Sequence, residues 1–319
     1  MILSVGLSPA WQKILVFDAL DTGQVNRAHT AKWCASGKVF NAGIAVHTLG
    51  GPGLTLAPVG GMAREPIEKE LRALGMAYRF IETRTTTRVC TTIVDEATGS
   101  ITELVEEGQP MSADELEKFR AAYREESKRA DVVVVMGSLP QGVPVSFYRE
   151  LLQETRCPMV LDFRGKGLLS VLDLNPLVIK PNREELEKTL GHSFKKESAL
   201  LDAMRWLNRK GAGWVVVTDR QGPIRVSSAT EIYRIQPADI ETTRVINPIG
   251  SGDAMAGTIA REIANGMRNG TIETEIFIPD AVRRGVAAAA QNVRQLLPCR
   301  LDPSGLETEA TTIRIERLE

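Results

Sequence analysis

Strand-sized apolar runs separated by amphipathic stretches constrain the fold of this chain more than any other feature. Short runs rich in Val occur at 132–136 and 214–218, and another apolar run occupies 159–161. Between these runs, segments 113–129 and 197–211 have the apolar spacing of amphipathic helices. Strands that are apolar throughout are typical of a parallel sheet covered on both faces. The sequence therefore predicts an α/β fold with a doubly wound, mostly parallel sheet and helices on both faces.

A second, smaller sheet is predicted from strand-like segments with no helix between them. Two of these segments flank a turn at 96–100 that contains Gly, as in a β-hairpin. We expect segments of about 12–34 and 80–106 to form a small β lid, which is part of a single domain that spans residues 1–319. The strand-like segments are 14–18, 26–33, 88–94 and 101–105.

Charge and composition exclude several classes of function. Lys and Arg number 39 and Asp and Glu number 40, so the formal charge of −1 gives no overall field for nucleic acid or an anionic membrane. No apolar stretch approaches the roughly 20 residues of a membrane-spanning helix, and the N-terminus lacks the features of a signal peptide. The four cysteines form no CxxC pair and are expected to be reduced thiols. These features predict a soluble cytoplasmic protein.

The segment Gly250-Ser251-Gly252-Asp253 is the strongest candidate for a phosphate site. It follows a short apolar run that Pro248 ends, and it precedes a stretch with helical character. Glycines let the backbone N–H groups approach a phosphate, and the start of a helix adds positive potential. A carboxylate placed there is suited to take a proton from an acceptor hydroxyl. The alternative is that Asp253 only caps the helix.

Several motifs along the chain resemble those of the PfkB, or ribokinase-like, carbohydrate kinases. They occur in the order found in that family, and together they are most similar to 1-phosphofructokinase and tagatose-6-phosphate kinase. The motifs are Gly23-Gln24-Val25-Asn26-Arg27, Ser36-Gly37-Lys38-Val39-Phe40-Asn41, Thr87-Arg88, Gly137-Ser138-Leu139-Pro140, Lys180-Pro181-Asn182-Arg183-Glu184-Glu185 and 247–253.

The resemblance implies ATP-dependent phosphorylation of a small sugar phosphate, with Mg²⁺ and a ribokinase-like fold. In this reading Asp253 is the base, and residues 250–252 supply the anion hole. The acceptor would contact Gln12, Arg27, Gly37, Lys38, Asn41, Arg88 and Ser138. The nucleotide would contact Asn182, Thr218, Arg220, Gly222, Gly250 and Gly252.

Asn182 and Glu185 are the predicted metal residues. They are three residues apart, so on a helix they would share a face and could organise Mg²⁺ through water. The alternative is a helix cap with an exposed Glu.

The chain departs from the family pattern at the acceptor side. Gln12 stands where the family has an Asp that binds sugar hydroxyls, and Ser36 and Val39 replace two glycines. The turn 219–223 lacks the usual double glycine, so Arg220 either contacts phosphate or belongs to an altered surface turn. The aromatic residues Trp11, Trp33 and Phe40 flank these changes and could narrow the pocket, although core packing is the alternative.

Fructose 1-phosphate, fructose 6-phosphate and tagatose 6-phosphate form the expected acceptor class. The alternatives are a kinase for a neutral sugar or nucleoside, and a homologue that binds a sugar phosphate or nucleotide without useful turnover. The basic set Arg27, Lys38 and Arg88 favours a phosphorylated acceptor. A homodimer through the β lid is also implied by the resemblance.

Overall fold

A ten-stranded sheet forms the centre of the molecule. The computed structural model describes residues 1–220, 222–238, 245–272 and 276–319. Within them, the strand order is β14-β13-β12-β11-β10-β9-β8-β1-β4-β5; neighbours from β11 to β5 are parallel, and β12 to β14 add antiparallel strands. The strands are β1 (Ile2–Val5), β4 (Gly53–Gly60), β5 (Ala77–Thr83), β8 (Val132–Met136), β9 (Met159–Asp162), β10 (Val178–Ile179), β11 (Trp214–Val217), β12 (Ile224–Ser227), β13 (Ile232–Gln236) and β14 (Arg314–Arg317).

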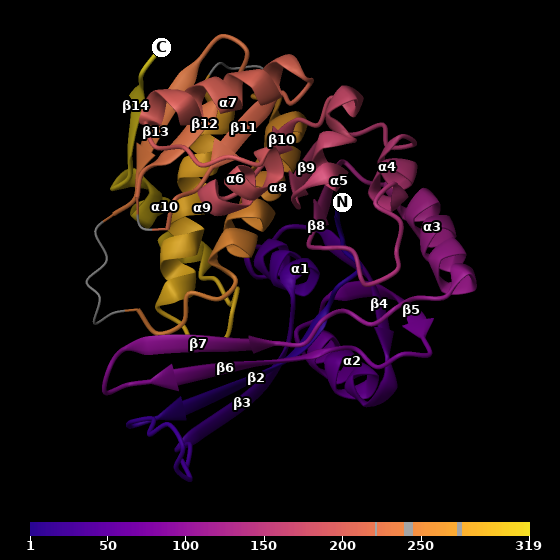
Figure 1. Cartoon of the computed structure of the whole chain (residues 1–319). Helices are drawn as coiled ribbons and strands as arrows, with labels where there is room; N and C mark the ends of the chain where they lie inside the picture. The colour runs from indigo at the N-terminus through magenta and orange to yellow at the C-terminus, as the bar shows by residue number, and fades with distance from the viewer. Residues whose placement is uncertain (221, 239–244, 273–275) are drawn as a thin grey trace.

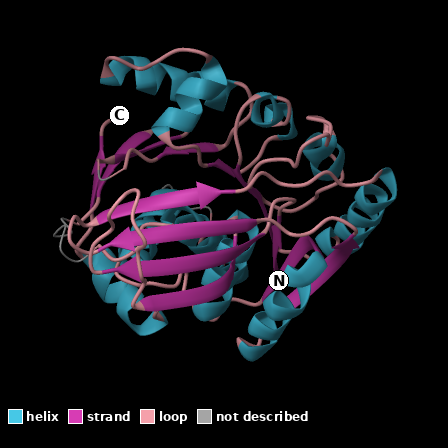
Figure 2. Ribbon diagram, turned by 60° about the horizontal axis from the view of Figure 1, so that its bottom comes forward, coloured by secondary structure: helices cyan, strands magenta, loops and turns pink. Residues whose placement is uncertain are grey.

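Helices cover both faces of this sheet (Figures 1 and 2), as the sequence predicts. One apolar core contains Ile44 and Ile259, and the other contains Phe119 and Leu207. No helix in the described part of the chain is long and apolar enough to cross a membrane. The first face carries α1 (Lys38–Thr48), α2 (Arg64–Ala73), α8 (Ser251–Asn269), α9 (Phe277–Val293) and α10 (Pro303–Thr311), and the second carries α3 (Ala113–Ser127), α4 (Phe147–Leu152), α5 (Lys166–Leu169), α6 (Arg183–Leu190) and α7 (Glu197–Arg209). Two 3₁₀ turns, η1 (Gly61–Ala63) and η2 (Leu172–Leu174), complete the helical elements of the described residues.

The lid is a separate four-stranded sheet that projects from the main body (Figure 1). Its order is β3-β2-β6-β7, with β2 parallel to β6 and the other pairs antiparallel. Residues 80–83 belong to β5 of the main sheet, residues 26–29 precede β3, and the lid strands include residues 10–11 and 35–36 as well. The strands are β2 (Ala10–Phe17), β3 (Thr30–Ser36), β6 (Val89–Asp95) and β7 (Ser100–Val105).

The two faces of the lid differ in their surroundings. Strand β2 alternates between buried and half-buried residues, with Gln12, Ile14 and Val16 on the buried face. On the opposite face, the rings of Trp11 and Trp33 stack with centroids 5.7 Å apart. These two tryptophans therefore do not narrow the pocket, in contrast to one of the two interpretations of the sequence.

Close backbone packing joins α8 to α1. A Cβ atom at Gly257 would lie 2.7 Å from the carbonyl oxygen of Ala42, so only glycine fits at this crossing without a shift. The contact places the first turn of α8, which carries Asp253, next to α1, which carries Lys38 and Asn41.

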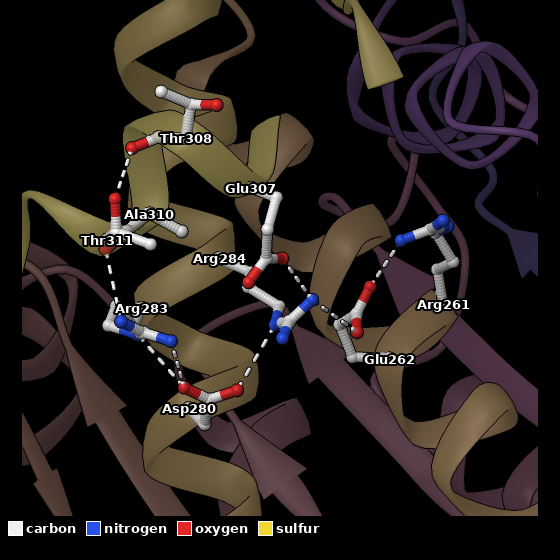
Figure 3. Close-up of polar contacts among 9 residues, drawn as sticks. All are labelled: Arg261, Glu262, Asp280, Arg283, Arg284, Glu307, Thr308, Ala310 and Thr311. Atoms are coloured by element: carbon white, nitrogen blue, oxygen red, sulfur yellow. Dashed lines mark hydrogen bonds and ion pairs between the residues drawn. The ribbon is translucent and has the colours of Figure 1, made fainter. Parts of the chain in front are cut away.

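An ion-pair cluster fixes the far side of α8 (Figure 3). Arg284 of α9 contacts Asp280 at 3.1 Å, Glu262 of α8 at 3.7 Å and Glu307 of α10 at 2.6 Å. Arg283 also donates to Asp280, at 2.9 Å from its Nε. Single exposed ion pairs contribute little to stability, but a shared arginine sets the relative positions of three helices. The ion pairs thus fix α8, whose first turn carries Asp253, relative to α9 and α10.

Candidate active site

A single large cavity of about 1440 Å³ brings most of the predicted residues together. Its volume exceeds the few hundred Å³ typical of a site for one small ligand, so it has room for two substrates. It lies at the carboxyl ends of the parallel strands, where ligands bind in open α/β sheets. The predicted residues that line it are Gln12, Gly37, Lys38, Asn41, Arg88, Ser138, Asn182, Glu185, Thr218, Arg220, Gly250, Ser251, Gly252 and Asp253.

The loop before α8 has the geometry of an anion hole. Gly250 is the N-cap residue with φ +86°, a conformation that other L-residues rarely adopt. The N–H of Ser251 donates to the carbonyl oxygen of Pro248 at 3.2 Å. Helix geometry leaves the N–H groups of Gly252 and Asp253 without an acceptor inside the helix. These two donors face a cavity that has room for a phosphate.

Asn292 and Cys299 hold this loop from below. The buried amide of Asn292 donates to the Ile249 carbonyl at 2.9 Å and to Ser251 Oγ at 3.0 Å. Its Oδ1 accepts the N–H of Cys299 at 2.6 Å, and the Cys299 thiol lies 3.4 Å from the Gly250 carbonyl oxygen. The hydrogen bonds use both N–H groups and the oxygen of the amide. They fix the loop without using the N–H groups that point into the cavity.

Asp253 is buried in the first turn of α8, and its Oδ2 accepts a hydrogen bond from Asn41 Nδ2 at 2.8 Å. Its side chain thus bonds to another helix, whereas a cap would bond to the N–H groups of its own helix. Burial raises the pKa of Asp253, and Lys38 opposes this shift while Asp162 adds to it. A carboxylate whose ionised form is poorly solvated accepts a proton more readily.

Two lysines share the buried carboxylate of Asp162. Lys38 Nζ lies 2.9 Å from Asp162 Oδ1 and 3.5 Å from Glu185 Oε1, and Lys180 Nζ lies 3.0 Å from Asp162 Oδ2. Burial alone raises the pKa of Asp162, but Lys180 and Lys38 lower it below its usual value. Burial would lower the pKa of Lys38, but Asp162, Glu185 and Asp253 raise it. Asp162 and Lys38 are therefore both charged at neutral pH.

Lys180 links this charge cluster to the anion hole. A Cβ atom at Gly252 would lie 3.4 Å from Lys180 Nζ, so the ammonium group lies close to the first turn of α8. Lys180 is only 3% exposed, and its contact with Asp162 holds the ammonium group in place at the cavity wall. A phosphate bound at the first turn of α8 would therefore lie close to this positive charge.

Asn182 and Glu185 form a capping box at the start of α6. Asn182 Oδ1 accepts the N–H of Glu185 at 2.8 Å, and Glu185 Oε2 accepts the N–H of Asn182 at 3.0 Å. The two residues therefore do not share a helix face, because Asn182 precedes the helix. Glu185 Oε1 is directed toward Lys38, inside the cavity. One carboxylate oxygen fits a site in which Mg²⁺ keeps most of its waters.

The guanidinium of Arg88 is fixed by three backbone carbonyl groups. Nε donates to Pro9 at 3.3 Å, Nη1 to Glu106 at 3.1 Å and Nη2 to Ser8 at 3.2 Å. A guanidinium has five N–H donors. Within the described residues these contacts leave one N–H on each terminal nitrogen without a protein acceptor, and a phosphate oxygen is a suitable acceptor for a charged donor.

Gln12, Gly37 and Ser138, which are also predicted to contact the acceptor, line the cavity. Gln12 is 1% exposed, and its Nε2 donates to Thr92 Oγ1 at 2.7 Å. Gly37 has φ +81°, and a Cβ there would lie 2.9 Å from the Ser8 carbonyl oxygen. This glycine is needed where the chain turns from the lid into α1. Ser138 follows β8 at the cavity wall.

Two predicted residues do not line the cavity. Arg27 is exposed on the loop between β2 and β3 and is not part of the cavity lining. Gly222 donates its N–H to the Asp219 carbonyl at 2.6 Å and is a turn residue. Arg220 has φ +48° and does line the cavity, whereas Gln221 lies outside the described residues.

No role was predicted from the sequence for Asp162, Lys180, Glu103 or Asn292, although Lys180 begins one of the motifs. The first two directly end or follow buried strands, and polar residues at the carboxyl ends of parallel strands indicate a site. That signal could have found them. Glu103 and Asn292 carry no comparable signal, because each depends on which way a strand or helix faces.

A family model supplies the decisive comparison. The model described as pfkB family carbohydrate kinase matches residues 8–303, which is nearly the whole chain. The chain belongs to the pfkB family. The match confirms the family that the motifs predict. Since the family consists of carbohydrate kinases, the chain is a sugar kinase.

Solved structures similar to this pfkB-family chain share its fold over their full length. A possible 1-phosphofructokinase from Thermotoga maritima is 20% identical, with a TM-score of 0.86 and 100% of both chains covered. Phosphofructokinase-2 from Escherichia coli in complex with fructose-6-phosphate is 21% identical, with a TM-score of 0.81 and coverage of 98% of this chain and 99% of that chain. Its tetrameric inhibited form is 21% identical, with a TM-score of 0.84 and coverage of 97% and 99%.

Proposed function

We propose that this pfkB-family sugar kinase transfers the γ-phosphoryl group of ATP to a hydroxyl of a sugar phosphate. The acceptor class is that of fructose 1-phosphate, fructose 6-phosphate and tagatose 6-phosphate. The observation that carries the proposal is the position of Asp253, a buried carboxylate in the first turn of α8 beside free backbone N–H groups.

The chain's own residues account for the chemistry of the transfer. Asp253 takes the proton of the acceptor hydroxyl as its oxygen attacks the γ-phosphorus, and the bond to the β,γ-bridging oxygen breaks. The N–H groups of Gly252 and Asp253 and the ammonium of Lys180 stabilise charge on the transferring group. Asn41 holds the Asp253 carboxylate in place during this step.

The acceptor's own phosphate is assigned to Arg88. The other two predicted basic residues are poorer candidates for this phosphate. Lys38 is already paired with Asp162 and Glu185, and Arg27 does not line the cavity. Arg88 keeps two N–H donors and a positive charge, which match a phosphate better than a neutral hydroxyl. A phosphorylated acceptor is therefore favoured over a neutral sugar or nucleoside.

Mg²⁺ would be held by the ATP phosphates and by Glu185, with water as its other ligands. The metal would supply charge neutralisation on the nucleotide. Thr218 and Arg220 are assigned to the nucleotide side of the cavity, because they follow β11 at its wall.

An acceptor screen tests this function. ATP consumption is measured with fructose 1-phosphate, fructose 6-phosphate, tagatose 6-phosphate and the corresponding neutral sugars, with and without Mg²⁺. We expect at least one phosphorylated sugar to raise turnover well above that of its neutral counterpart, because only the former uses Arg88. Preference for a neutral sugar would identify the alternative kinase, and no stimulation by any acceptor would favour a binding homologue.

The outer face of the lid is assigned to a homodimer. Trp33 is 43% exposed and Leu104 is 55% exposed, and both lie on the side opposite Gln12 in the sheet register. Lys13 lies over the Trp33 ring at 5.3 Å from its centroid. Exposed apolar residues grouped on one sheet face are typical of an interface.

We expect Trp33→Glu to shift the protein from dimer to monomer in sedimentation velocity, because it places a charge in the apolar centre of this face. Trp206→Glu on α7 is the matched control, since Trp206 is also partly exposed and lies on another surface. Equal sedimentation of both variants and the unmodified protein would exclude the lid as the interface.

A further inference from the structure

Glu103 is a carboxylate on the lid that faces the reaction site. In the register of β6 and β7 it lies opposite Thr92, the residue that accepts the hydrogen bond from Gln12. Gln12, Glu103 and Cys90 all line the cavity that contains Asp253. The inner face of the lid therefore presents one amide and one carboxylate to the acceptor.

Two charged residues of the acceptor pocket, Arg88 and Asp253, act on Glu103. Glu103 is exposed to solvent, but partial desolvation by the surrounding residues raises its pKa, Arg88 opposes this shift and Asp253 adds to it. Glu103 thus interacts both with the residue assigned to the acceptor phosphate and with the base. In the described residues, no hydrogen bond or ion pair occupies its carboxylate oxygens.

Resting on the proposed function, we propose that Glu103 determines which acceptors the kinase uses. Its carboxylate accepts a hydrogen bond from an acceptor hydroxyl that faces the lid, and it repels an acceptor with a carboxylate at that position. The substrate class is thereby narrowed to sugar or polyol phosphates, with sugar-acid phosphates excluded.

The chemistry of the pocket supports selection by repulsion. Asp253 and Glu103 already place two acidic groups in the cavity, and Gln12 supplies no charge to balance them. Arg88 is the compensating cation near Glu103, and the acceptor's phosphate neutralises it on binding. A second anionic group that faces the lid would then meet the charge of Glu103 after its nearby cation has been neutralised, which costs binding free energy.

Two measurements on Glu103→Gln test the inference. The first is the KM of the best sugar phosphate from the screen, and the second is the inhibition constant of 6-phosphogluconate against it. We expect the KM to rise severalfold with little change in the KM of ATP. The inhibition constant should fall at least about tenfold, because the repulsion is removed while the shape of the side chain is kept.

Glu96→Gln is the matched control, since Glu96 is an exposed carboxylate of the lid that directly follows β6 and does not line the cavity. It should leave both constants unchanged. If the unmodified protein turns over a sugar phosphate but Glu103→Gln alters neither constant, the inference is wrong and the proposed function stands. If no acceptor stimulates turnover in the unmodified protein, both are overturned.

Discussion

Asp253→Asn should abolish phosphoryl transfer while leaving the fold intact. An amide cannot take the proton of the acceptor hydroxyl, and removal of a general base costs about 10²–10⁴-fold in rate. The amide oxygen can still accept the hydrogen bond from Asn41, so the local geometry is kept. The measurement is kcat for the best acceptor in the screen, together with the KM values of both substrates, which should change little.

The stability of this variant separates catalysis from folding. The pKa of Asp253 is raised in the folded state, so its ionised form is less stable there than in the unfolded chain. Stability is therefore lost as pH rises through this pKa, and a neutral Asn at 253 removes that loss. We expect the melting midpoint at neutral pH to be unchanged or higher, while kcat of the unmodified protein should fall as pH decreases toward the pKa. Asp202→Asn, on the exposed side of α7, is the control and should have the kcat of the unmodified protein. A normal kcat for Asp253→Asn would contradict its assignment as the base.

Asp162→Asn should cause the largest loss of stability. Its carboxylate is the shared partner of Lys180 and Lys38, and Lys180 is almost fully buried. Breaking a buried ion pair by removing one partner costs about 3–5 kcal/mol, because the remaining charge is left uncompensated. Urea denaturation measures the change in the free energy of unfolding. The depressed pKa of Asp162 means that its contribution is present at neutral pH and is lost as pH falls through that pKa.

The control for this variant is Asp173→Asn, in which an exposed pair with Arg149 is broken. Exposed pairs contribute little, so its urea midpoint should barely move. Equal effects of the two substitutions would indicate that the lysines do not depend on Asp162. We also expect Asp162→Asn to lower kcat, since Lys180 loses the anchor that holds it beside the anion hole.

The alternation of apolar runs and amphipathic segments was sufficient to predict the sheet and several helices. Segment 113–129 is helix α3 over Ala113–Ser127, and segment 197–211 is α7 over Glu197–Arg209. Both patterns are local, so they can be read from neighbouring residues. The edges of the lid were less predictable, because residues 80–83 join the main sheet through pairing with β4, a contact between distant segments.

The candidate site was predictable in position but not in its internal contacts. Motifs located Lys38 correctly at the cavity, yet its carboxylate partners come from β9 and α6 and cannot be inferred from its own segment. Asn182 caps the helix, which was the alternative to a shared helix face, but Glu185 is directed toward Lys38 and is not exposed. The assignment of these residues to substrates stays a prediction until kinetics are measured.

The support beneath the anion hole has a consequence for biosynthesis. Asn292 and Cys299 hold the loop at Ile249, Gly250 and Ser251, although they follow it by about forty to fifty residues in the chain. A nascent polypeptide that has passed Asp253 but not Cys299 lacks these contacts. Since domains emerge from the ribosome starting at the N-terminus, the loop acquires its final shape only after the segment that carries Asn292 and Cys299 has been synthesised. Incomplete chains, including those from premature termination, would then carry the base without the geometry that makes it useful.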